Sequence, residues 1–128
     1  MSAIEQAAAA LREAAATVTP TTVDSFRVHP DVGPGVDPPA VIVGVPALEW
    51  EGLCAGPTSA QFPVWVVVPP DLARADVRLY ELVPLVAAAL DEVPDATVVR
   101  ADPGTYPSSS GDLPAYQIQV DYALSPGA

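Results

Sequence analysis

The stretch FPVWVVV at residues 62–68 constrains the fold more than any other part of the sequence, because it is β-branched and aromatic and has no polar face. A strand with one side in water alternates apolar and polar residues, whereas a continuously apolar strand is buried on both faces. The run AVIVG at residues 40–44 has the same character. We therefore expect both runs to be central strands of a sheet.

The N-terminal segment has the pattern of an amphipathic helix. Ser2 and Glu5 fit the S-x-x-E capping box, in which a hydroxyl and a carboxylate satisfy free N–H groups at a helix start. We expect a helix from about residue 2 to residue 17 that lies on the surface of another part of the fold. Its thin apolar stripe consists of Ile4, Ala8, Leu11, Ala15 and Val18.

A second helix is predicted from Asp71, as its N-cap, to about Glu92. It is the main core helix, and Pro84 is expected to kink it, since proline lacks an N–H and its ring clashes with the carbonyl of the preceding turn. Its apolar face consists of Leu79, Leu82, Val86, Leu90 and Val93.

The remaining predicted strands are short. They lie at residues 21–28, around Leu48 to Glu51, at 96–101 and at 115–124. The Gly- and Pro-rich stretches 29–39 and 103–114 are expected to be long loops. The last strand alternates, with Tyr116, Ile118, Val120, Tyr122 and Leu124 on a packed face and Gln117, Gln119 and Asp121 on a wet one.

This order of elements predicts an α+β fold. We expect a mainly antiparallel sheet of four to five strands with helices packed on one face, and residues 1–128 as a single domain.

The charge balance excludes several classes of function. The chain carries five arginines, no lysine and sixteen acidic residues, for a net charge of -11. Direct binding of nucleic acid is disfavoured, because it needs a basic surface that releases counterions.

No apolar run is long enough to span a membrane, and the N-terminus does not resemble a secretory signal. Cys54 is the one cysteine, which agrees with a reducing compartment and excludes an internal disulfide or a cysteine zinc site.

No residue pattern supports an enzyme, a cofactor site or a metal site. His29 is the only histidine, and a catalytic Ser108, Ser109 or Ser110 would need that histidine from a different loop. The sequence has no G-x-S-x-G, H-E-x-x-H, P-loop or G-x-G-x-x-G motif. We interpret His29 as a surface turn residue and the serines as a polar loop.

Two groups of acidic residues have a structural explanation. In a strand, Glu49 and Glu51 share one face, so they are expected to be solvated over a buried Trp50. The group Asp91, Glu92 and Asp95 ends the second helix, where negative charge opposes the helix dipole. The second group is either an ordinary solvated helix end or a contact for a basic partner.

Three stretches carry a family resemblance: VGVPALEWEGLCAGPTSAQFPVWVVV at residues 43–68, LYELVPLVAAALDEVPDA at 79–96 and ADPGTYPSSSGDLPAYQIQV at 101–120. Together they resemble the small tail-terminator proteins of long-tailed phages (siphoviruses) of actinobacteria. The resemblance implies a structural virion protein and not an enzyme. It implies a hexameric ring that caps the tail tube, stops its polymerisation and provides the surface for head-to-tail joining.

The resemblance also implies partners and a location. The partners are further copies of the chain, the major tail-tube protein and a head-completion or stopper protein, while DNA passes through the ring without specific binding. The location is the head–tail junction of the virion, after assembly in the host bacterial cytoplasm. Within this interpretation PSSSGD is an assembly loop, and the interface candidates are Tyr106, Ser108, Ser109, Ser110 and Asp112. Tyr106 either anchors the interface, as aromatic residues often do, or packs the base of the loop.

Two alternatives remain open. The first is another ring protein of the head–tail junction, such as a stopper or connector subunit. The second is a small cytosolic ligand-binding or enzymatic domain with a pocket beside Trp50 and Trp65.

Overall fold

The computed structural model describes residues 2–18, 27–29, 35, 38–51, 56–70, 74–109 and 111–124. The elements in chain order are α1 (Ala3–Ala16), β1 (Arg27–His29), β2 (Ala40–Val43), β3 (Ala47–Glu49), β4 (Ser59–Val67), α2 (Ala75–Asp91), β5 (Ala96–Ser108) and β6 (Gly111–Ala123).

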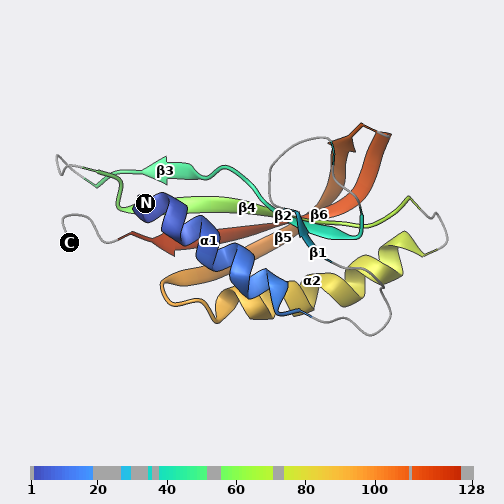
Figure 1. Ribbon diagram of the computed structural model, residues 1–128, viewed down its shortest axis with the longest axis horizontal. Helices are drawn as coiled ribbons and strands as arrows, with labels where there is room; N and C mark the ends of the chain where they lie inside the picture. Colours follow the sequence, from blue (N-terminus) through green and yellow to red (C-terminus); the bar gives the residue numbers. More distant parts are fainter. Residues whose placement is uncertain are drawn as a thin grey trace.

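The strands form one sheet in the order β1-β2-β4-β6-β5, and β3 pairs with β4 beside this path. Only β1 and β2 pair in parallel, and the other pairings are antiparallel. Both helices lie on one side of the sheet (Figure 1). The predicted α+β class is therefore confirmed, and the apolar run of β4 is central as expected.

The main core lies between the helices and the inner face of the sheet. Phe62, Val64 and Val66 of β4 point into it and are fully buried. From α2 the predicted stripe supplies Leu79, Leu82, Val86 and Leu90, and α1 supplies Ala7, Leu11 and Ala15. The alternation predicted for the last strand also holds, because Ile118 and Val120 of β6 are buried in this core.

The capping box at the start of α1 is confirmed. The Glu5 N–H donates to Ser2 Oγ at 3.1 Å, and the Ser2 N–H donates to Glu5 Oε1 at 3.3 Å. Both bonds satisfy donors that have no partner inside the helix.

Replacing Ser2 with alanine is therefore expected to lower the free energy of unfolding by about 1 kcal/mol. Chemical denaturation followed by circular dichroism measures this loss. A Ser2→Asp variant, which keeps an oxygen acceptor at the cap, should retain most of the stability. Equal stability of Ser2→Ala and the wild type would contradict this account of the cap.

The start of α2 differs from the prediction. The helix begins at Ala75 with Arg74 as its N-cap, and no side chain caps it. Asp71, the predicted N-cap, lies outside the described residues and is not the cap. The helix runs to Asp91 with Pro84 on its exposed side, and the expected kink at Pro84 stays a prediction.

The largest correction concerns the stretch 103–114, which is not a loop but part of a long β-hairpin. Strand β5 extends to Ser108 instead of residue 101, and β6 starts at Gly111 instead of residue 115. The two prolines and the glycine of DPGTYP suggested a break in the chain. Strand β5 lies at the edge of the sheet, so one side of its backbone makes no hydrogen bonds to a neighbouring strand. Proline, which lacks an N–H, is tolerated on that side.

Trp50 is the second correction, because its indole is 55% exposed and not buried beneath the glutamates. Strand β3 ends at Glu49 and pairs with β4, and the described part of the chain leaves the residue that follows it largely uncovered. Of the strand predicted at 21–28, only residues 27 and 28 fall in described β1; residues 21–26 lie outside the described residues.

Gly44 marks a close approach between the chain that leaves β2 and the central strand β4. Its N–H donates to the Pro63 carbonyl oxygen at 2.7 Å. A Cβ atom at this position would lie 2.8 Å from Pro63 Cγ and 2.9 Å from that oxygen. Any larger residue at position 44 would push the backbone there away from Pro63 of β4.

Gly44→Ala is expected to cost about 1–3 kcal/mol of folding free energy, since the added methyl group overpacks the contact with Pro63. Gly104→Ala is the matched control, because a Cβ there meets nothing within 4 Å, and it should change stability by less than about 0.5 kcal/mol. Thermal melts of both variants make the comparison. Equal melting temperatures would show that Gly44 is not required for this approach.

Candidate functional site

The tip of the β5–β6 hairpin contains most of the predicted interface residues. Ser108 of β5 pairs with Gly111 of β6, and the Ser108 hydroxyl donates to the Gly111 carbonyl oxygen at 2.5 Å. Gly111 has a φ of 111°, a conformation that favours glycine directly after the turn. Gly111 and the Ser108 hydroxyl together fix the position of the turn in the hairpin.

The exposure of the predicted residues divides them into two groups. Ser109 and Asp112 are exposed and Ser108 is half-buried, so these three lie together at the tip. Ser110 lies outside the described residues. Tyr106 is only 5% exposed and faces away from solvent.

Tyr106 belongs to a second, smaller core on the outer face of the sheet. Its ring meets the ring of Trp65 edge-on, with centroids 5.6 Å apart and planes at 65°. Leu113 lies directly across the hairpin from Tyr106 and is also buried. The members of this second core are Ala40, Ile42, Val67, Tyr106, Leu113 and Ala115. Within the chain, Tyr106 therefore packs the base of the hairpin tip, which is the second of its two predicted roles.

The hairpin extends away from the helices, as Figure 1 shows for the distal parts of β5 and β6. The contact between Tyr106 and Trp65 fixes it against β4, and edge-to-face aromatic pairs add about 0.5–1.5 kcal/mol beyond their buried area. The tip is thus a polar end on an arm that is anchored at its base.

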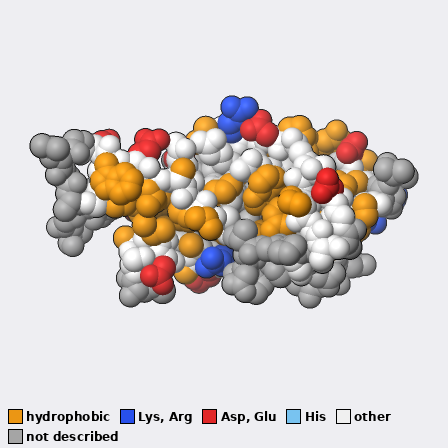
Figure 2. Space-filling model, turned by 90° about the horizontal axis from the view of Figure 1, so that it is seen from above, with side chains coloured by type: hydrophobic (Ala, Val, Ile, Leu, Met, Phe, Trp, Pro, Cys, Tyr) orange, Lys and Arg blue, Asp and Glu red, His pale blue; other side chains and the backbone are white. Residues whose placement is uncertain are grey.

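The outer face of the sheet, beside the hairpin, exposes both hydrophobic and acidic side chains. Figure 2 looks at the molecule from the side of β3 and shows a band of hydrophobic side chains across the middle, with acidic side chains scattered around it. Val45 and Trp50, which flank β3, are exposed by 77% and 55%. Large exposed apolar side chains beside polar ones are typical of contact surfaces.

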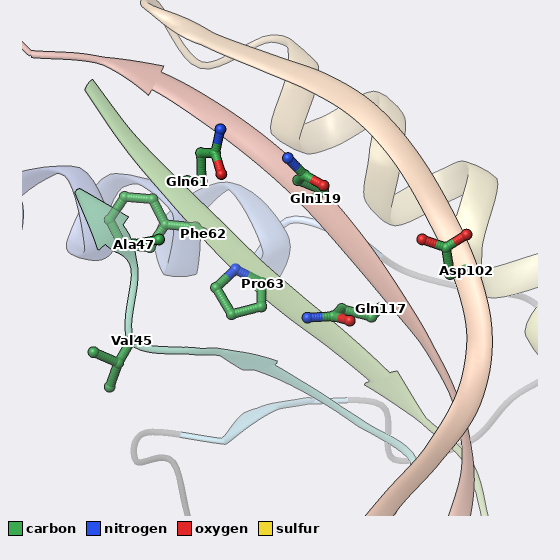
Figure 3. A pocket seen from close by; sticks show the side chains of 8 residues that line it. All are labelled: Val45, Ala47, Gln61, Phe62, Pro63, Asp102, Gln117 and Gln119. Carbon is green, nitrogen blue, oxygen red and sulfur yellow. The ribbon is translucent and has the colours of Figure 1, made fainter. Parts of the chain in front are cut away.

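An open hollow of about 230 Å³ lies on this outer face, between the central strands and the segment before β3 (Figure 3). Its polar lining consists of Gln61, Gln117, Gln119 and Asp102. Adjacent to it, the Gln61 side chain donates from Nε2 to Glu49 Oε1 at 3.2 Å and ties β3 to β4. Amide groups donate and accept hydrogen bonds, so this lining can recognise a polar surface.

The hollow does not match the pocket predicted beside Trp50 and Trp65, since neither tryptophan lines it. Gln117 and Gln119 were placed on the wet face of the last strand by alternation. The sequence did not point to Gln61, because it precedes the apolar run of β4. In the sheet it pairs with Asp121 of β6, and this pairing places it on the same face as Gln117 and Gln119.

A charged pair lies on β5 at the edge of the sheet. Arg100 Nη2 donates to Asp102 Oδ1 at 2.8 Å, and this bond raises the pKa of Arg100. A register shift between Val98 and Arg100 interrupts the pairing next to it. Charges and bulges on an edge strand discourage pairing with other strands, so we expect contacts through side chains and not through strand addition.

Potential metal ligands do not gather in the part of the chain that is described. No group of three or more His, Cys, Asp or Glu side chains in these residues could hold a metal ion. The side chain of His29, and Cys54 as a whole, lie outside the described residues. Among the described helices, none has the length and apolar character needed to cross a membrane.

Comparison of the chain with models of known protein families gave no match, and comparison with curated proteins gave none either.

Proposed function

We propose that this protein is a tail-terminator subunit: a structural virion protein that forms a hexameric ring on the end of a phage tail tube. In this role the ring stops tube polymerisation and offers its other side to a head-completion or stopper protein. The proposal begins from the resemblance of residues 43–68, 79–96 and 101–120 to that family.

The β5–β6 hairpin is the observation that carries the proposal. It is a long arm that is anchored at Tyr106 and ends in exposed Ser109 and Asp112. A subunit that works by contact needs a surface that keeps its geometry before the partner arrives, because ordering that surface on binding costs affinity. The contact of Tyr106 with Trp65 supports this need, because it anchors the base of the arm before any partner binds.

The outer face of the sheet supports the same role. The helices cover the inner face, whereas the outer face presents amide side chains together with exposed Val45 and Trp50. The acidic composition is also compatible, since a channel lined by part of a chain with a net charge of -11 would repel DNA during its passage.

A stopper or connector subunit of the same junction is the nearest alternative, and the partner that the ring binds distinguishes the two. The open, amide-lined hollow argues against a ligand-binding domain, because binding sites for small molecules are usually enclosed and mostly apolar.

The test is a capping assay with the major tail-tube protein from the same genome. The purified protein, added during tube polymerisation, should attach to one end of each tube and shorten the length distribution, as measured by negative-stain electron microscopy. Binding to the head-side ring alone would favour a stopper. Tubes of unchanged length with bare ends would contradict the terminator proposal.

A further inference from the structure

Strand β5 contains one residue more than its pairing with β6 requires. Val98 pairs with Val120 and Arg100 pairs with Gln119, so two neighbouring residues of β6 face residues of β5 that have Val99 between them. The side chain of Val99 is 50% exposed and belongs to neither of the two hydrophobic cores. Two residues on one strand opposite a single residue on its partner is the arrangement of a β-bulge.

The pairing of β5 with β6 does not need this extra residue. The register is continuous on both sides of Val99. Without it, Val98 and Arg100 would be consecutive and would keep their present partners on β6. The alternation of faces would also hold, because Val98 packs on the main core, whereas Tyr106 lies six residues beyond Arg100 and packs on the outer one. The bulge therefore has an effect other than pairing.

A bulge bends its strand and increases the local twist, and the hairpin arm shows a bend of this kind. Tyr106 faces Leu113 of β6, and Trp65 faces Gln117, four residues further along the same strand. In a flat sheet their Cα atoms would lie about 16 Å apart, given a strand spacing of about 4.8 Å and a rise of about 3.3 Å per residue. The rings nevertheless meet with centroids 5.6 Å apart.

The arm therefore curls toward the outer face of the sheet. Figure 1 shows the distal ends of β5 and β6 turning away from the helices, which lie on the inner face. The pairing of β6 with β4 reaches only Ala115, so beyond that residue the ladder consists of β5 and β6 alone. The direction of the arm is then determined by the twist within this pair of strands.

We propose that Val99 is a positioning residue, because the bulge that it forms aims the hairpin arm and thereby places the tip. The role depends on the extra residue and not on its valine side chain, which packs in neither core. The direction of the arm is independent of the proposed function, whereas the consequence for capping rests on it. In that function the bulge determines which surface the exposed tip residues Ser109 and Asp112 reach.

Deletion of Val99 tests the direction of the arm, and Val99→Ala is the matched control, because it keeps the bulge and shortens only the side chain. Double electron–electron resonance measures the distance between spin labels at Ser109→Cys on the tip and Glu13→Cys on α1, in a Cys54→Ser background. Both labelled positions are exposed.

The expected change in this distance follows from the length of the arm. The tip lies about ten residues beyond Val99 and a strand rises about 3.3 Å per residue, so a change of about 10° in direction moves the tip by about 5 Å. Deletion should therefore shift the distance between the labels by about 5 Å or more. Val99→Ala should leave the distance unchanged.

Three outcomes would overturn the inference. Circular dichroism shows whether the deletion variant folds, and a variant that does not fold would contradict the claim that pairing is independent of Val99. An unchanged distance would show that the bulge does not aim the arm. The same shift in Val99→Ala would show that the side chain, and not the extra residue, is responsible.

The capping assay, with unlabelled variants, tests the consequence for function. Deletion should raise the concentration that caps half of the tubes at least about tenfold, since a misdirected tip has to be reordered on binding. Val99→Ala should cap as the wild type does. Normal capping by a variant whose arm has moved would contradict the positioning role. A wild type that never caps tubes would contradict the terminator proposal, and the distance between the labels would still decide whether the bulge aims the arm.

Discussion

Replacing residues 107–112 with the dipeptide Asn-Gly is expected to abolish capping of tail tubes while the protein stays folded. The replacement removes the exposed tip, including Ser109 and Asp112, and joins Tyr106 to Leu113 through a two-residue turn. These two residues face each other across the hairpin, and Asn-Gly favours the tight turn that connects such a pair. The buried contact of Tyr106 with Trp65 is retained.

The matched control keeps the full hairpin and its tip and changes an exposed residue before Tyr106, with Thr105→Ser. Thermal melts should place both variants within about 1 kcal/mol of the wild type. Electron microscopy should show that the control shortens the tubes as the wild type does, whereas the variant with the shortened hairpin leaves their length unchanged. If the shortened variant caps tubes normally, the hairpin tip is not the contact surface.

Phe62→Ala is expected to destabilise the fold by about 3–5 kcal/mol, because it removes a fully buried ring from the central strand. The ring meets Tyr122 of β6 edge-on, with centroids 6.4 Å apart, and it fills the core beneath both helices. For a chain of this size the loss corresponds to a decrease in melting temperature of about 10–20 °C. Differential scanning calorimetry measures it directly.

Val45→Ala is the control for this prediction, since Val45 is largely exposed on the opposite face. Its melting temperature should change by no more than about 2 °C. A small effect of Phe62→Ala would mean that the core lies elsewhere than between the helices and β4.

The elements that sequence reasoning located correctly are those with a strong periodic pattern. The capping box of Ser2 and Glu5, the buried stripe of α2 and the alternation of β6 all follow from spacing along a single segment. The central position of β4 also follows from its apolar residues, but its outer side, at Pro63 and Trp65, is half-buried and not fully buried as predicted.

The hairpin could not be predicted in the same way, because its strands contain residues that usually interrupt strands. Pro103, Gly104 and Pro107 are compatible with β5 only because that strand lies at the edge of the sheet, and strand order is a property of the whole fold. The role of Tyr106 depended on the same information. Its partner Trp65 is distant in sequence, and only the pairing of β4 and β5 with β6 brings the two rings together.

The outward side of α2 shows a further limit of periodicity. The buried stripe was predicted from Leu79, Leu82, Val86 and Leu90, but a pattern that accounts for one side of a helix says little about the other. The exposure of Val77 and Tyr80 becomes informative only when the core is known to lie on the opposite side.

Native mass spectrometry of the wild-type protein over a concentration series shows whether the protein assembles as a ring subunit. A ring subunit should give a complex with six times the mass of the 13.2 kDa chain, and negative-stain images of the concentrated sample should contain closed six-fold rings. Monomers at every concentration, with a small molecule retained in their mass, would contradict it and favour a ligand-binding domain.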